Sequence, residues 1–245
     1  MQPCCTAEVF CGTKSTESMT MSTAPPQGSP ADSAGRFKEP FSGCSHAAGL
    51  GAAIIGSLVL GLGLKRDPGT IATVVVYAAT LVTLYAASSA YHLIRASDRL
   101  EPWLRRLDHC AIFAFIAGTC TPVFFHAFDG LRRTIMLVAI WAIAAVGMFS
   151  RIVWLGAPRW LYTAMYVGMG WVVVVQGRAF LQGMTTEVTM LVVAGGLVYT
   201  AGAIVYATKR PNLFGGRFGF HDLWHLFVLG GSGCHFAAVW ALSHG

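Results

Sequence analysis

The chain has 245 residues, of which 55% are hydrophobic and only 11% are charged, with 17 Lys and Arg against 11 Asp and Glu. Soluble domains carry about 25% charged residues, so this chain has too few charges to cover a water-facing surface. The composition excludes a typical soluble enzyme, a disordered chain and a nucleic-acid-binding protein, and it indicates an integral membrane protein.

The chain begins with a polar segment, residues 1–35, which contains two adjacent prolines and many Ser and Thr residues. This composition predicts a disordered cytoplasmic tail, because little in it could pack. The segment also lacks the basic start and apolar core of a signal peptide. Residues 36–245 are therefore expected to form one membrane domain.

Seven stretches without Asp, Glu, Lys or Arg follow. A helix needs about 20 mostly apolar residues to cross the hydrocarbon core of a bilayer, with about 17–25 as the usual range. The stretches are Pro40–Leu64, Pro68–Ile94, His109–Phe128, Thr134–Ser150, Trp160–Gly177, Val188–Thr208 and Leu223–Gly245. All seven are long enough, so the sequence predicts an all-α integral membrane protein with a seven-transmembrane helix bundle.

Lys and Arg residues are shared unevenly between the two sides of this bundle. The side with the N-terminal segment and the connections after the second, fourth and sixth spans holds 12 of them, and the other side holds 5. Connections rich in Lys and Arg stay on the cytoplasmic side. We therefore expect a multi-pass protein of the cell membrane with its N-terminus in the cytoplasm and its C-terminus outside.

Four polar clusters lie at the cytoplasmic ends of the first, second, third and seventh spans. Their members in chain order are Glu39, Ser42, His46, Ser88, His92, Asp108, His221, Asp222 and His225. Because successive spans run in opposite directions, all four clusters are expected at one depth. Polar groups at membrane depth are costly and are candidates for function.

Two spacings within these clusters place side chains on one helix face. His221 and His225 are four residues apart, so their imidazoles could reach one metal ion, and Asp222 takes the position of the Glu in the H-E-x-x-H motif. Ser88 and His92 have the same spacing, although a Ser that bonds to its own helix is a common alternative. Three histidines, a carboxylate and a hydroxyl match a catalytic zinc with an open position for water. Three imidazoles would also accept other divalent metals.

These motifs, in this order, resemble the hemolysin III family. This is a bacterial family related to the progestin and adipoQ receptors and, more distantly, to alkaline ceramidases. The resemblance covers roughly Glu39 to Trp240 and is carried by Ser88-x-x-x-His92, by the run from Leu107 to Pro122, and by His221-Asp-Leu-Trp-His225 with His235.

The resemblance implies seven helices, a cytoplasmic N-terminus and a zinc site near the cytoplasmic face. It implies three zinc ligands: His92, His221 and His225. Asp108 would hold a water at the zinc, with the Ser88 hydroxyl beside it to bond the water or a developing oxyanion.

The start of the first span resembles the first motif of the family. Glu39 and His46 match that motif, whereas Ser42 stands where the family has Asn. Together with Asp222, these three side chains are expected in the surroundings of the zinc ligands.

Three functions stay open at this point. The first is a zinc-dependent hydrolase of membrane lipid amides or esters, favoured by the three-histidine site with an adjacent carboxylate. The second is a pore-forming cytolysin, as the family name suggests. The third is a membrane-lipid sensor or receptor in which zinc is structural. Membrane lipids are the expected partners in each case, and the sequence predicts neither the substrate nor the oligomeric state.

Overall fold

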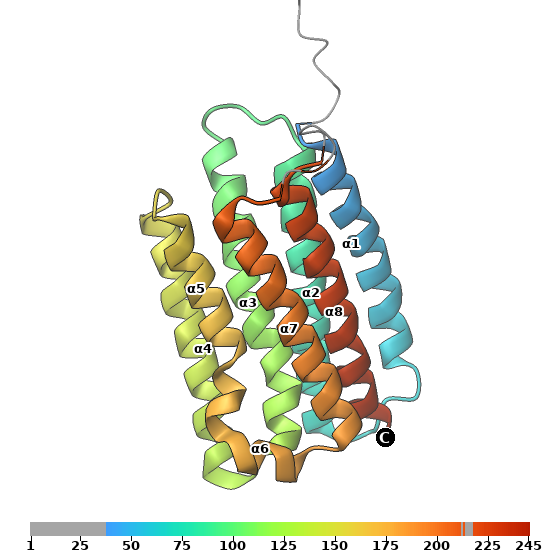
Figure 1. Cartoon of the computed structure of the whole chain (residues 1–245). Coiled ribbons are helices and arrows are strands. Elements are labelled where there is room, and N and C mark those ends of the chain that lie inside the picture. The colour runs from blue at the N-terminus through green and yellow to red at the C-terminus, as the bar shows by residue number, and fades with distance from the viewer. Residues whose placement is uncertain (1–37, 212, 214–217) are drawn as a thin grey trace, which may run out of the picture. The chain divides into compact units, whose positions relative to one another are not determined.

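The structure is a computed structural model that describes residues 38–211, 213 and 218–245, and the predicted tail lies outside this part of the chain. The elements are α1 (Pro40–Gly61), α2 (Pro68–Leu93), α3 (Glu101–Ala127), α4 (Gly130–Val153), α5 (Arg159–Gly170), η1 (Val172–Gln176), α6 (Gly177–Gly183), α7 (Thr186–Thr208) and α8 (Phe220–His244). Six of the helices are long and apolar enough to cross a membrane, and α5 with the bent η1–α6 segment makes a seventh candidate if the bent pair is one span. The predicted all-α membrane bundle is confirmed (Figure 1).

Local chemistry explains where several helices begin. Pro68 opens α2, where its missing N–H leaves no hydrogen bond unmade and its fixed φ suits a helix. The carboxylate of Asp67, the residue before the helix, accepts the backbone N–H of Thr70 in the first turn at 2.8 Å. The Thr185 hydroxyl accepts the N–H of Val188 at 3.3 Å in the same way at the start of α7. These caps satisfy N–H groups that have no partner inside the helix.

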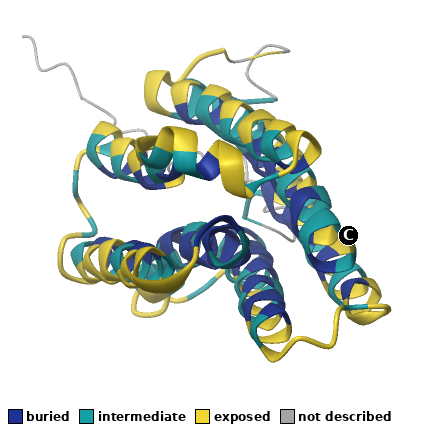
Figure 2. Cartoon of the chain, turned by 90° about the horizontal axis from the view of Figure 1, so that it is seen from below, coloured by how far each residue is buried: buried dark blue, intermediate teal, exposed yellow. Residues whose placement is uncertain are grey.

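Helix α3 forms the core of the bundle. Of its most apolar window, 67% is buried, against 22–39% for the other five single-helix spans. Helices α2 and α4 pack along α3, and α7 packs along α8. The outer surface is apolar as well, with Ile55 on α1 and Val146 on α4 each 65% exposed. Figure 2 shows buried residues on the facing sides of the helices and exposed residues around the outside, as a lipid environment requires.

The sequence predicts one continuous span, the fifth, over Trp160–Gly177, whereas the helix is broken in this region. Helix α5 ends at Gly170, and the chain continues at an angle of 41° to Gly183. Four consecutive valines after Trp171 favour a helix poorly, and Gly177 takes a positive φ of 38°. The Trp171 indole N–H also donates to the Thr200 hydroxyl of α7 at 2.9 Å, which ties the break to its neighbour.

The third span begins earlier than expected. Helix α3 starts at Glu101, eight residues before the charge-free stretch that begins at His109. The charge-free criterion missed the first two turns because they contain Arg105 and Arg106, whose long side chains can reach the membrane surface from a helix end. Asp108 therefore lies inside α3 and is 8% exposed.

Candidate metal centre

Helices α1, α3 and α8 begin at the end of the bundle where α2 finishes, which is uppermost in Figure 1 and is called the histidine end here. His92 lies in the last turn of α2, and His221 and His225 lie in the first two turns of α8. A spacing of four residues puts the last two on one helix face. The topology thus brings together side chains that are more than 100 positions apart in the sequence.

His92, His221 and His225 form the compact group. One ligand nitrogen from each residue lies within 4.8 Å of the other two. The Nε2 atoms of His221 and His225 are 3.2 Å apart. His92 is 1% exposed and His225 is 2% exposed, whereas His221 is partly exposed. Three imidazoles that converge in this way could hold a metal ion and leave a coordination position open.

Glu39 lies directly outside this group. Its Oε2 accepts a hydrogen bond from Nδ1 of His92 at 2.7 Å and lies 3.8 Å from Nε2 of His221. With Nδ1 engaged, His92 can offer Nε2 to a metal, and a carboxylate in this outer position is common around metal-binding histidines. The hydrogen bond from His92 is the main reason why the pKa of the Glu39 carboxyl is lowered.

Asp108 lies in the same cavity but outside the three-residue group. Its Oδ2 is 3.3 Å from Nδ1 of His109, which also donates to the carbonyl oxygen of Arg105 at 2.8 Å. Ser88 lines the same cavity as Asp108. The carboxylate is therefore buried, paired with His109 and on the wall of the cavity that the three histidines also line.

His46 supports the site from α1. Its Nδ1 shares a hydrogen bond of 2.8 Å with the Ser88 hydroxyl. Its ring lies against the ring of His225, with 3.9 Å between the centroids. His46 is thus linked by a ring contact to one member of the group and by a hydrogen bond to Ser88, which also lines the cavity.

Ser42 and Asp222 join α1 to the start of α8. The Ser42 hydroxyl donates to Oδ1 of Asp222 at 2.8 Å, and Oδ2 of Asp222 accepts the backbone N–H of Gly219 at 2.9 Å. Both carboxylate oxygens of Asp222 are thus engaged away from the three histidines. Asp222 holds the first turn of α8, which carries His221 and is followed one turn later by His225.

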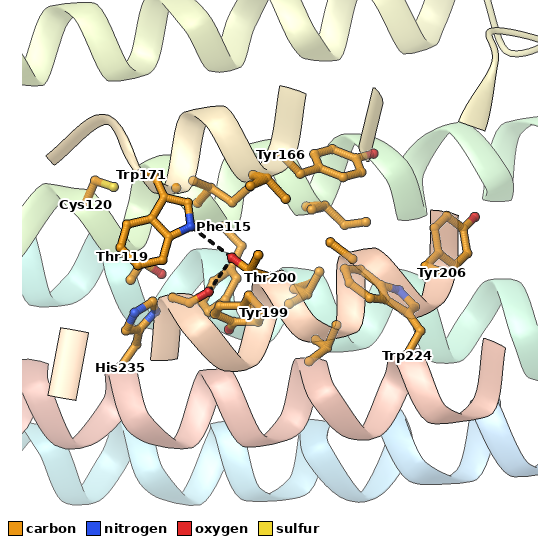
Figure 3. A pocket seen from close by; sticks show the side chains of 18 of the residues that line it. Phe115, Thr119, Cys120, Tyr166, Trp171, Tyr199, Thr200, Tyr206, Trp224 and His235 are labelled. Atoms are coloured by element: carbon orange, nitrogen blue, oxygen red, sulfur yellow. Dashed lines mark hydrogen bonds between the residues drawn. The ribbon is translucent and has the colours of Figure 1, made fainter. Parts of the chain in front are cut away.

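A cavity of about 630 Å³ extends from these side chains into the bundle. Its walls come mainly from α3, the broken fifth span, α7 and α8 and are mostly apolar (Figure 3). In Figure 3, Tyr206 and Trp224 lie at one end of the view, which is the histidine end because Tyr206 is near the end of α7 and Trp224 near the start of α8. Trp171, Thr119 and His235 lie at the other end of the view. A cavity of this size can enclose a drug-sized ligand.

Sequence reasoning missed some polar residues that line the cavity. Arg105 and Arg159 lie on its wall near the histidine end, together with Tyr162 and Tyr206, whose hydroxyl groups are 3.3 Å apart. The spacing of Arg159 and Tyr162 by three residues was a usable signal, because it places both on one helix face.

Comparison with known proteins is consistent with this architecture. A family model described as "Haemolysin-III related" matches residues 35–236. "Hemolysin-3" of Bacillus cereus is 32% identical over 195 residues, which cover 78% of this chain and 86% of that protein. The "Monocyte to macrophage differentiation factor" of Homo sapiens is 26% identical over 220 residues, which cover 84% and 87%. A rice "Heptahelical transmembrane protein ADIPOR2" is 29% identical over 175 residues, which cover 64% and 76%.

Proposed function

The chain belongs to the haemolysin-III related family and is a multi-pass protein of the cell membrane, and from this premise we propose that it is a zinc-dependent hydrolase of a membrane lipid amide or ester. One observation carries the proposal: the convergence of His92, His221 and His225 beside the buried carboxylate of Asp108 at the end of a mostly apolar cavity. Such a site joins a hydrolytic centre to space for an acyl chain.

The donor set supports zinc as the metal. Zinc favours imidazole nitrogen, and catalytic zinc sites use three protein ligands and keep a fourth position open. His92, His221 and His225 would hold the ion, which supplies Lewis-acid activation of water or of a substrate carbonyl when it is bound. Nε2 of His225 is the nitrogen that faces His221, at 3.2 Å from its Nε2. Nδ1 of His225 is buried without a partner among the described residues.

Asp108 would act as the general base. As a water oxygen bonds to the carbonyl carbon of the lipid, the carboxylate accepts the proton that this water loses. The same proton then passes to the leaving nitrogen or oxygen when the amide or ester bond breaks. His109, whose Nδ1 lies 3.3 Å from the carboxylate, would hold it in position for both transfers, and the Ser88 hydroxyl on the same cavity wall would bond the water or the developing oxyanion.

The Asp108→Asn variant tests the assignment of the base. The amide keeps the size of the side chain but cannot accept the proton, so we expect turnover to fall by about 10²–10⁴-fold while the zinc content and the fold are retained. Cleavage of lipid amides and esters would be assayed in detergent, with zinc measured on the same samples. Full turnover by a zinc-loaded Asp108→Asn protein would refute the assignment, and no turnover by the wild type on any lipid tested would favour a sensor with a structural zinc.

A second candidate is a pore-forming cytolysin, which the name of the Bacillus cereus relative favours. The purified protein would then release dye from liposomes at a rate that the Asp108→Asn substitution does not change. Absence of dye release together with lipid cleavage would leave the hydrolase as the better account.

A further inference from the structure

The inner end of the cavity contains two buried polar atoms that have no hydrogen-bond partner among the described residues. They are the hydroxyl oxygen of Thr119 on α3 and Nδ1 of His235 on α8. Both residues line the cavity, and Figure 3 shows them near Trp171, at the end away from Tyr206 and Trp224. Thr119 is 6% exposed. A buried polar group without a partner costs about 1–3 kcal/mol, so a ligand that satisfies such a group binds more tightly.

The free hydroxyl of Thr119 is unusual in this bundle. A Thr inside a helix commonly bonds back to a carbonyl one turn earlier. Thr121, Thr163 and Thr200 all do so, at 2.7, 2.8 and 2.7 Å. Thr119 makes no such bond, so its hydroxyl is available to form a hydrogen bond with a ligand.

His235 offers an acceptor with a defined protonation. Its Nε2 lies 3.2 Å from the carbonyl oxygen of Val192. A carbonyl oxygen only accepts, so Nε2 carries the proton, and Nδ1 of the neutral ring is an acceptor. Helix α7 holds the ring closely, because a Cβ atom at Gly195 would lie 2.6 Å from it.

A donor from Thr119 and an acceptor from His235 at the same end of the cavity suit a ligand hydroxyl, which can accept from the first and donate to the second. An ester or ketone carbonyl could satisfy only Thr119. Thr119 follows Asp108 by eleven residues in α3, and His235 follows His225 by ten residues in α8, where both helices run inward from the histidine end. At a rise of 1.5 Å per residue, the pair lies about 15 Å deeper than the metal-binding group.

We propose that Thr119 and His235 form a second polar subsite, which binds a hydroxyl group on the acyl chain of the lipid. The inference rests on the proposed function in one respect, because the lipid head is placed at the histidine end. It goes beyond that function by naming a hydroxylated acyl chain as the preferred ligand.

Binding of 12-hydroxystearate and stearate in detergent, measured by isothermal titration calorimetry, tests the subsite. The two probes differ only by one mid-chain hydroxyl. The wild type should bind 12-hydroxystearate roughly 10-fold more tightly, since two hydrogen bonds are gained. Thr119→Val and His235→Phe should each remove most of this preference. Thr119→Val should bind stearate as the wild type does, which shows that the variant is folded.

Thr73→Val is the matched control, because Thr73 is buried, bonds back to the Thr70 carbonyl and lies outside the cavity wall. It should retain the full preference. Equal affinity of the wild type for both probes, a preference that survives Thr119→Val, or no binding of either probe would overturn the proposal. Binding and cleavage by the wild type separate the two proposals: a retained preference without lipid cleavage would refute only the hydrolase, and lipid cleavage without the preference would refute only the subsite.

Discussion

At the scale of single residues, the hydrogen bonds of each imidazole decide what its ring can offer. His92 commits Nδ1 to the carboxylate of Glu39, and His46 commits Nδ1 to the hydroxyl of Ser88. His221 and His225 instead turn Nε2 toward one another at 3.2 Å. Two neutral rings gain one hydrogen bond from this arrangement, whereas a shared cation uses both nitrogens as ligands. This geometry is the reason why we expect a metal at this point.

Removal of the ligands should empty the proposed site. We expect one zinc ion per purified wild-type chain and a large loss in the His221→Ala, His225→Ala double variant, because a single imidazole encloses the ion poorly. Elemental analysis of the purified proteins measures this. His126→Ala is the control, since His126 lies in the last turn of α3 at the opposite end and should leave the zinc content unchanged. Equal zinc in wild type and double variant would contradict the site.

At the scale of elements, the N-terminal cap of α2 should make the stability of the folded bundle depend on pH. Hydrogen bonds from the backbone N–H and the hydroxyl of Thr70 lower the pKa of the Asp67 carboxyl. A group whose pKa is lowered on folding stabilises the folded state above its unfolded pKa of about 3.9 and loses this effect as the pH falls through the folded value.

Asp67→Ala should therefore lower the unfolding temperature at pH 6, and the difference from the wild type should narrow as the pH is lowered below 4. Thermal unfolding in detergent at several pH values measures it. A difference that stays constant, or that grows toward acid, would assign the effect to something other than the ionised cap.

Close contact between α2 and α3 depends on Gly118. A Cβ atom at this position would lie 2.0 Å from the hydroxyl oxygen and 2.8 Å from Cβ of Thr80, whose branched side chain cannot swing away easily. Gly118→Ala should lower the free energy of unfolding by about 1–3 kcal/mol, as overpacking does. Gly51→Ala is the matched control on α1, where nothing lies within 4 Å of the added atom, and stability there should stay the same or rise slightly. Equal effects of the two substitutions would show that α2 and α3 tolerate a wider separation.

At the scale of the whole molecule, the direction of insertion decides which compartment reaches the metal-binding group. The helix ends with the histidines are joined by connections on the side that carries 12 of the 17 Lys and Arg residues. The positive-inside rule therefore predicts that this end faces the cytoplasm. The cavity would then extend from the histidine end at the cytoplasmic side into the membrane.

Reporter fusions test this orientation. A reporter that is active only outside the membrane should be active after Gly245 and inactive at the N-terminus, and a cytoplasmic reporter should give the reverse pattern. Activity of both fusions on one side would mean an even number of crossings, and the bent α5–η1–α6 segment would then be a re-entrant loop rather than a span.

Much of the fold could be predicted from the sequence because membrane insertion depends on local composition. The uninterrupted apolar stretches predicted the bounds of α1, α2, α7 and α8 to within three residues, and α8, for example, starts at Phe220, three residues before its stretch. The break at Trp171 was not predicted. The four valines, with Gly170 and Gly177, weaken a helix, but they do not determine whether a neighbouring helix stabilises a break. That outcome depends on the hydrogen bond from Trp171 to Thr200, which joins different helices.

Sequence alone also determined that the polar clusters share one depth, because spans of similar length that alternate in direction return to the same surface. Which side chains meet at that depth was decided by tertiary structure. Spacing could put Asp222 on the first turn of α8, yet its carboxylate faces Ser42 and Gly219 rather than the histidines. The free hydroxyl of Thr119 likewise carries no signature in the sequence. Depth follows from helix length, but the direction of a side chain follows from how each helix is rotated against its neighbours, and only packing sets that rotation.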